Sequence, residues 1–201
     1  MANTIRYGLK NAKYAIYDAE QGTYGALKSM PGAVSLSLST EGGDSSDFYA
    51  DDGIYYTFAG TNGGYSAELE LARITDVIRA DLLGEIVDAT SGVQFETTEA
   101  AQIQFALITE MQGDQYPIGF VFYNCVASRP EMNANTKGES PDVDTDTLNI
   151  RITSQKFTYD GAEKSFVQGH IEKTSANAAQ FSAFFSSVVT PGGSGESGLS
   201  A

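Results

Sequence analysis

The sequence predicts a mainly β, single-domain protein, and three observations carry this prediction. Short runs of alternating apolar and polar residues recur along the chain, which is the pattern of half-buried strands. Glycine is abundant, with 21 residues, and marks turns between these runs. Phe and Tyr contribute 11 residues each, which is enough for a core in a chain of 201 residues. We assign residues 1–190 to the domain and the Gly- and Ser-rich residues 191–201 to a flexible tail.

The strands are predicted from this alternation. It is clearest in residues 34–39 and 67–72, where Val34 and the leucines are expected to face the core while the intervening Ser and Glu side chains face away. Residues 5–17 predict one or two strands near the N-terminus. Further strands are expected at residues 103–111, 120–127, 148–153 and 166–173.

Residues 41–64, between the two clearest strands, are too many for an ordinary hairpin turn. They mix acids and glycines with aromatic residues, whereas disordered segments are poor in aromatics. We therefore predict a protruding hairpin arm that packs against another chain; the alternative is a hairpin folded back on its own sheet. The candidate interface residues are Asp44, Asp47, Phe48, Tyr49, Asp51, Asp52, Tyr55, Tyr56, Phe58 and Tyr65.

Residues 129–147 are polar, contain Pro130 and Pro141, and predict a second long loop. Two long loops on a compact β-core favour contacts with other chains.

Two helices are expected. Residues 75–85 predict a short helix that Thr75 or Asp76 caps and that Gly84 ends; its stability must come from docking on a sheet. A terminal helix is predicted by the spacing i, i+3, i+4, i+7 of Phe181, Phe184, Phe185 and Val188.

The net charge of −14 argues against a nucleic-acid-binding surface, which needs Lys and Arg to replace counterions. No Lys or Arg occurs between Lys28 and Arg73, or between Arg79 and Arg129. In the first of these two stretches without Lys or Arg, Glu68 and Glu70 share one face of a predicted strand whose other face is leucine. They belong either to a solvent-exposed sheet face or to the inner wall of an oligomeric ring, where repeated carboxylates would sum to a negative field.

The sequence offers little for catalysis or cofactor binding, so we expect no enzyme, cofactor or metal site. His170 is the only histidine, and it has no partner with metal-ligand spacing. The single cysteine, Cys125, lies in a predicted strand and is expected to be a buried, inert thiol of a protein folded in a reducing cytoplasm. No apolar run is long enough to span a bilayer, and no signal peptide is expected.

Asp142, Asp144 and Asp146 have the spacing that opens a calcium loop. Thr147 stands where that loop needs Gly, however, and Thr153 stands where it needs Glu. A solvated acidic loop is favoured.

With these parts in order, the chain resembles the major tail proteins, the tail tube subunits of long, non-contractile-tailed bacteriophages. The resemblance covers nearly the whole chain and includes Tyr-Gly-Leu-Lys-Asn at residues 7–11. It is carried by residues 5–17, 31–38, 48–51, 55–56, 62–70, 81–85, 122–130, 136–140 and 181–191.

The resemblance implies a β-sandwich or barrel of two antiparallel sheets with a flanking short helix, the long arm and a C-terminal helix. It implies that six copies form a ring and that rings stack into a tube through which DNA leaves the virion, with Glu68 and Glu70 as lumen-facing candidates. Its implied partners are further copies of itself and the tape measure, tail terminator and distal tail or tail-tip proteins. Genomic DNA would pass without specific binding. The implied location is the virion, after assembly in the cytoplasm of the bacterial host. A non-catalytic β-sandwich binding or adhesion module is the alternative.

Overall fold

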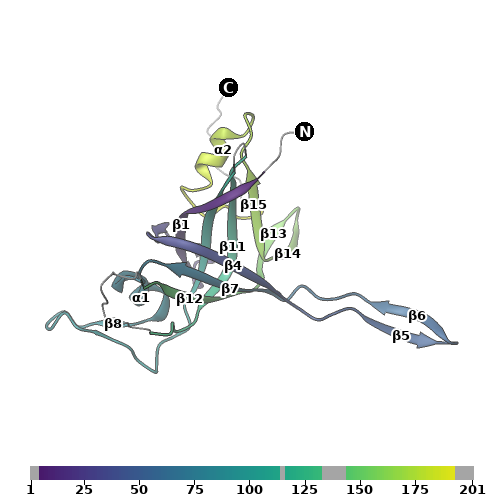
Figure 1. Cartoon of the computed structure of the whole chain (residues 1–201), viewed down its shortest axis with the longest axis horizontal. Helices are drawn as coiled ribbons and strands as arrows, with labels where there is room; N and C mark the ends of the chain where they lie inside the picture. The colour runs from purple at the N-terminus through teal and green to yellow at the C-terminus, as the bar shows by residue number, and fades with distance from the viewer. Residues whose placement is uncertain (1–4, 114–115, 133–143, 193–201) are drawn as a thin grey trace, which may run out of the picture.

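The computed structural model describes residues 5–113, 116–132 and 144–192 (Figure 1). It is mainly β, with antiparallel sheets and two helices, as the sequence predicts. The elements in chain order are β1 (Arg6–Asp18), β2 (Thr23–Tyr24), β3 (Lys28–Ser29), β4 (Ala33–Glu41), β5 (Ser46–Ala50), β6 (Gly53–Phe58), β7 (Gly64–Leu71), α1 (Asp76–Leu83), β8 (Ile86–Val87), β9 (Gln94–Phe95), β10 (Gln104–Gly113), β11 (Ile118–Ala127), β12 (Asp146–Ile152), β13 (Gln155–Tyr159), β14 (Ala162–Phe166), β15 (Gln168–Glu172) and α2 (Ala178–Ala183).

Nine strands belong to one hydrogen-bonded sheet with the order β2-β1-β10-β11-β12-β7-β4, in which β3 also pairs with β1 and β15 with β11. The sheet curls until β4 lies against β1. The other strands form the hairpins β5–β6, β8–β9 and β13–β14. The main strands are therefore parts of one branched sheet, where the resemblance led us to expect two separate sheets.

The branch lies within β11. Its first half pairs with β15 from Ile118 to Phe122, and its second half pairs with β12 from Cys125 to Ala127. Asn124 stands at the change of partner with a φ of 46°, a left-handed conformation that Asn tolerates better than most residues. Its Nδ2 donates to Thr153 Oγ1 at 2.7 Å, so its side chain joins β11 to the residue that follows β12.

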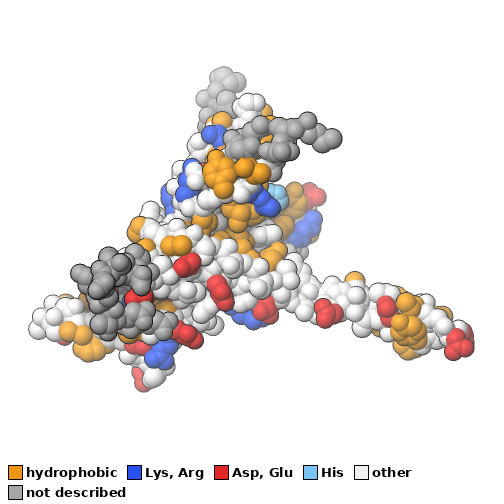
Figure 2. Space-filling model, viewed as in Figure 1, with side chains coloured by type: hydrophobic (Ala, Val, Ile, Leu, Met, Phe, Trp, Pro, Cys, Tyr) orange, Lys and Arg blue, Asp and Glu red, His pale blue; other side chains and the backbone are white. Residues whose placement is uncertain are grey.

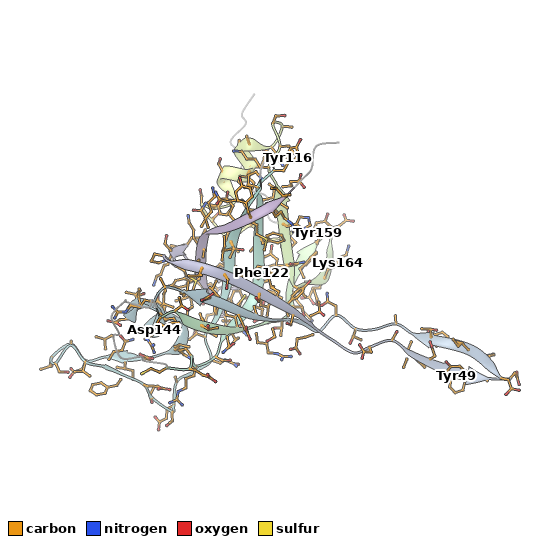
Figure 3. All side chains as sticks on the ribbon, in the orientation of Figure 1. Tyr49, Tyr116, Phe122, Asp144, Tyr159 and Lys164 are labelled. Carbon is orange, nitrogen blue, oxygen red and sulfur yellow. The ribbon has the colours of Figure 1, made fainter. Side chains whose placement is uncertain are left out.

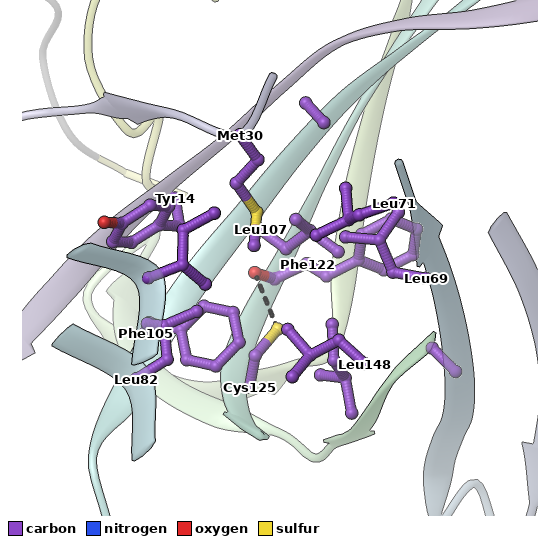
Figure 4. Close-up of a cluster of buried hydrophobic side chains, with 14 of the residues drawn as sticks. Tyr14, Met30, Leu69, Leu71, Leu82, Phe105, Leu107, Phe122, Cys125 and Leu148 are labelled. Atoms are coloured by element: carbon purple, nitrogen blue, oxygen red, sulfur yellow. Dashed lines mark hydrogen bonds between the residues drawn. The ribbon is translucent and has the colours of Figure 1, made fainter. Parts of the chain in front are cut away.

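Alternation along β10 and β11 supplies two cores. Leu107 and Phe122 enter the larger core, which β1, β4, β7, β12 and α1 enclose (Figure 4). Ile108, Val121 and Tyr123 point to the other face, where they meet Phe184 after α2 and the β13–β14 hairpin. The Tyr123 hydroxyl donates to the Val189 carbonyl at 2.6 Å, and burial raises the pKa of Tyr123 to about 12. The β10–β11 pair is therefore buried on both faces.

Helix α1 forms as predicted. Thr75 caps it by accepting a hydrogen bond from the Ile78 N–H at 3.4 Å, and Gly84 ends it with a φ of 71°. Ile78 and Leu82 are buried in the larger core. Asp81 anchors the helix to the sheet.

One side-chain prediction is wrong. Val34 is 51% exposed, and Ala33 packs on the core in its place. The cause is a register shift in the β4–β7 pairing, where Ala33 lies opposite Leu71 and Ser35 opposite Glu70. The extra residue turns Val34 away from the core.

The C-terminal helix is shorter than predicted. It ends at Ala183, although Phe181 and Phe184 are buried as expected. The second predicted loop is described only at its ends, because residues 133–143 lie outside the described part of the chain, as do 193–201 of the predicted tail. Within the described residues, neither helix is long and apolar enough to cross a membrane.

The Asp81 contacts generate a prediction about stability. Its Oδ2 accepts hydrogen bonds from Tyr14 Oη and Lys28 Nζ, each at 2.6 Å. Burial alone would raise the pKa of Asp81, but the bonds from Lys28 and Tyr14 outweigh it and hold the pKa below its usual value. A carboxyl whose pKa is lower in the folded state stabilises the fold at pH values above its unfolded pKa of about 4. This stabilisation is lost as the pH falls through the folded-state pKa.

We therefore expect Asp81→Asn to lower the free energy of unfolding by about 1 kcal/mol at neutral pH. The difference from the parent should shrink as pH falls below about 4. Urea unfolding across this pH range measures it. Asp160→Asn, in the exposed β13–β14 turn at a φ of 53°, is the control and should be neutral. A pH-independent loss in Asp81→Asn would contradict the account.

Candidate functional site

Two chain segments, residues 42–45 and 59–63, run side by side between the rest of the domain, which we call the body, and the β5–β6 hairpin (Figure 1). We call these two segments the neck. The N–H of Thr61 donates to the Gly43 carbonyl at 3.1 Å, and the N–H of Gly63 donates to the Glu41 carbonyl at 2.7 Å. A Cβ on Gly42 would lie 1.9 Å from the Thr61 carbonyl oxygen, so only glycine permits this approach. The glycines that the sequence places here hold the two segments together.

The hairpin itself has a two-residue turn. Asp51 and Asp52 have φ values of 50° and 61° between the paired residues Ala50 and Gly53. Positive φ at both central positions is typical of a type I′ turn, which suits the twist of the flanking strands and favours Asp, Asn and Gly. The register shifts once, between Phe48 and Tyr49.

The arm, defined here as residues 41–64, exposes many large apolar side chains near its end (Figure 2). Phe48 contacts Tyr55 with ring centroids 6.4 Å apart, and Tyr56 contacts Phe58 at 4.9 Å. These rings touch one another but remain open to solvent. The exposed fractions run from 55% for Phe48 to 74% for Tyr55 in the set Phe48, Tyr49, Ile54, Tyr55, Tyr56 and Phe58.

The hairpin projects from the body and does not fold back on its own sheet (Figure 1). That it packs against another chain stays a prediction. Tyr49 lies near the free end of the arm, far from Phe122 in the body (Figure 3). Tyr65 differs from the other candidates because it belongs to β7, where it packs partly against the larger core. The candidates that the structure places on the exposed arm are Asp44, Asp47, Phe48, Tyr49, Asp51, Asp52, Tyr55, Tyr56 and Phe58.

A second surface is the outer face of β4, β7 and β12, which we name the polar face. Glu68 lies between Ser37 and Asn149 in the register, and Glu70 lies between Ser35 and Thr147. The opposite side of these strands faces the larger core, so Glu68 and Glu70 point outward as the alternation predicts. The polar face comprises Ser35, Ser37, Ser39, Ser66, Glu68, Glu70, Thr147, Asn149 and Arg151.

Glu70 is held ionised on this face. Hydrogen bonds from Thr145 Oγ1 at 2.7 Å and Ser35 Oγ at 2.8 Å lower the pKa of the Glu70 carboxyl. Arg151, which the sequence reasoning did not consider, lies on the same face 3.8 Å from the carboxylate of Glu41. Short hydroxyl and amide side chains occupy most of the remaining positions, so the face is polar.

The sequence reasoning also missed the β8–β9 hairpin. Ile86 pairs with Phe95, and Val87 pairs with Gln94. The Asp88 carbonyl accepts from the Gly92 N–H at 2.8 Å in the turn between them. Each strand has only two residues, too few to show an alternating pattern. The exposed apolar side chains around this hairpin are Val77, Ile86, Val87, Val93 and Phe95.

Two reactive residue types lie apart from each other. Cys125 is fully buried, and this burial raises the pKa of its thiol. His170 is exposed on β15 beside the Phe120 ring. Across residues 5–113, 116–132 and 144–192, His, Cys, Asp and Glu side chains form no group of three that could hold a metal ion. Of the calcium-loop candidates, Asp142 lies outside these residues.

In comparisons with known proteins, no family matches the chain and no curated protein matches it. The resemblance to tail tube proteins therefore stays a prediction from the sequence.

The neck geometry generates a prediction. Gly42→Ala should separate the two neck segments, because its Cβ would meet the Thr61 carbonyl oxygen. We expect the arm to be cleaved faster by a nonspecific protease, while the unfolding of the body stays nearly unchanged. Gly53→Ala, which adds a Cβ with no atom within 4 Å, is the matched control. Equal cleavage of both variants and the parent would show that the neck tolerates the added methyl group.

Proposed function

We propose that this protein is a structural virion subunit that self-associates into stacked hexameric rings forming a bacteriophage tail tube. The single observation that carries the proposal is the arm, a projecting hairpin that leaves six large apolar side chains more than half exposed. Ring number, stacking and the role in DNA passage come from the resemblance to tail tube proteins.

The arm needs a partner for physical reasons. An isolated two-stranded hairpin is marginally stable in water. Full burial of one large apolar side chain stabilises by about 1.5 to 3 kcal/mol. Six such side chains together are comparable with the roughly 4 to 15 kcal/mol that association costs. Burial of the arm on another copy would therefore order the hairpin and bind the two copies at once.

The shape favours repeated assembly. The arm extends from one side of the body, while α1 and β8 lie at the other end (Figure 1). A contact between the arm of one copy and a different surface of the next is heterologous, and such contacts generate rings or open filaments. The two cores on either face of the β10–β11 pair support the sandwich-like tube fold that the resemblance implies.

The polar face suits a wall past which DNA slides. It has no large apolar side chain to grip bases, and Glu68 and Glu70 repel phosphates. The contact of Ser35 and Thr145 with Glu70 keeps that carboxylate charged. The tube would join the tape measure, tail terminator and distal tail proteins during assembly in the host cytoplasm, and genomic DNA would cross its lumen without specific binding.

Removal of the arm tests self-association. Replacing residues 42–63 by a two-residue turn between Glu41 and Gly64, which pair with each other, should leave a folded body that no longer assembles. Circular dichroism, mass photometry and negative-stain electron microscopy over a concentration series check this, with tail-tip initiator added where the parent alone stays monomeric.

The matched control is Tyr159→Ser, which removes an exposed ring from the β13–β14 hairpin and should assemble normally. Normal tubes from the arm deletion would refute the role of the arm. A parent chain that stays monomeric even with the initiator would favour the binding-module alternative.

Charge reversal on the polar face tests the conduit. Tubes of the double variant Glu68→Lys and Glu70→Lys should form but retain duplex DNA in cosedimentation, with retention falling as salt rises, because phosphates replace counterions at lysines. Parent tubes should retain none. The control reverses Glu163 and Glu172, which are exposed on β14 and β15. DNA retention by the control alone would place the polar face outside the lumen.

A further inference from the structure

The first half of β1 is exposed and is itself a free sheet edge, because β3 and β2 pair only with residues 13–14 and 17–18 of the second half. Residues 6–8 are exposed on both faces, whereas Tyr14 and Ala15 in the second half are fully buried. Gly8 and Asn11 have positive φ values of 71° and 53°. The pairing of β1 with β10 shifts register around these two residues, so the strand leaves the core at this end.

Two hollows lie between this part of β1 and the chain at and before β4. The first has a volume of about 230 Å³ and is lined by residues 6–9, Leu36 and Met111. The second, about 380 Å³, lies between residues 9–13 and 29–33. We name the surface around them the β1–β4 seam. The side chains exposed on or beside it are Ile5, Arg6, Tyr7, Lys10, Asn11, Ser29, Pro31 and Val34.

The charges of the seam and the arm are opposite. The exposed side chains of the seam include Arg6 and Lys10 and no acid, while Lys13, farther along β1, donates to the Phe185 carbonyl at 2.8 Å beside the smaller core. The arm, residues 41–64, contains five acids and no Lys or Arg. Lys10 pairs with Glu110 at 3.1 Å, whereas Arg6 forms no ion pair with any residue in the described ranges. The seam therefore offers an acidic, aromatic hairpin a guanidinium beside exposed apolar side chains, and guanidinium groups also attract aromatic rings.

We infer that the β1–β4 seam of one copy receives the arm of a second copy, an inference that rests on the proposed self-association. The exposed apolar side chains of the two surfaces cover one another, and Arg6 of the first copy faces acids on the arm of the second. In this contact each copy inserts its arm, which we call the donor element, into the seam of a neighbour, which we call the acceptor surface.

The β8–β9 hairpin is the competing acceptor because it is also exposed and apolar. Its surroundings have the wrong charge, however. Residues 73–103 contain six acids against Arg73 and Arg79. Lys28 pairs with Asp81 and Arg129 pairs with Glu96, so two acids remain in excess in this region. An arm with five acids is repelled there.

Cross-linking between two chains that each carry one added cysteine tests the pairing. Tyr55→Cys on one chain and Tyr7→Cys on the other, mixed under assembly conditions, should give a covalent dimer with a short bismaleimide. The yield should be about tenfold above that of either chain alone, because docking holds the two thiols at high effective concentration. The native Cys125 is fully buried, and the parent chain controls for its reaction. The matched comparison pairs Tyr55→Cys with Phe95→Cys on the β8–β9 hairpin.

An exchange of charges between the two surfaces is a second, independent test. Arg6→Glu and Asp47→Arg should each raise the protein concentration needed for assembly by about tenfold, and the two together should restore most of the loss. Lys156→Glu, on the exposed β13–β14 hairpin, should leave assembly unchanged.

The outcomes separate this inference from the proposed function. If the chain assembles but Tyr55→Cys cross-links preferentially to Phe95→Cys, the seam is not the acceptor, while self-association stands. The same conclusion follows if assembly is not restored when Arg6→Glu and Asp47→Arg are combined. A parent chain that never assembles would overturn both.

Discussion

The fold depends on the β10–β11 pair, because both of its faces are buried. Leu107 and Phe122 belong to the larger core, and Ile108 and Val121 belong to the smaller one. Within this pair, β11 also changes partner from β15 to β12 at Asn124, which has a left-handed backbone. The curled sheet and α1 enclose one side of this pair, and α2 with the β13–β14 hairpin covers the other.

The arm stands outside this arrangement. Its neck and turn are specified locally, by glycines that permit close backbone approach and by two aspartates with positive φ. Its exposed rings contact one another yet bury little surface against the body. Packing on the body therefore contributes little free energy to the order of the hairpin. Our proposals assign the binding of the arm to further copies of the chain, with the arm as donor and the β1–β4 seam as acceptor.

The polar face and the core share the same three strands. Alternation puts leucines and isoleucines on one side of β4, β7 and β12 and serines, glutamates and amides on the other. Because one strand set serves both purposes, the packing of the core behind the polar face also holds that face in place. In the proposed tube, a rigid polar wall with few cations would let DNA pass without specific contacts.

Local sequence patterns were sufficient to predict the β class, the capped helix α1, the outward position of Glu68 and Glu70, and the protruding arm, because these follow from alternation, capping residues and glycine placement within short segments. It did not determine the exposure of Val34, the branch at Asn124, the place of Tyr65 in the core, or the two-residue strands β8 and β9. Those depend on register shifts and on pairing between residues far apart in the chain, such as Asn124 with Thr153 and Ser35 with Glu70. The tertiary structure alone decided which exposed surfaces remain for a partner, since exposure is what packing leaves over.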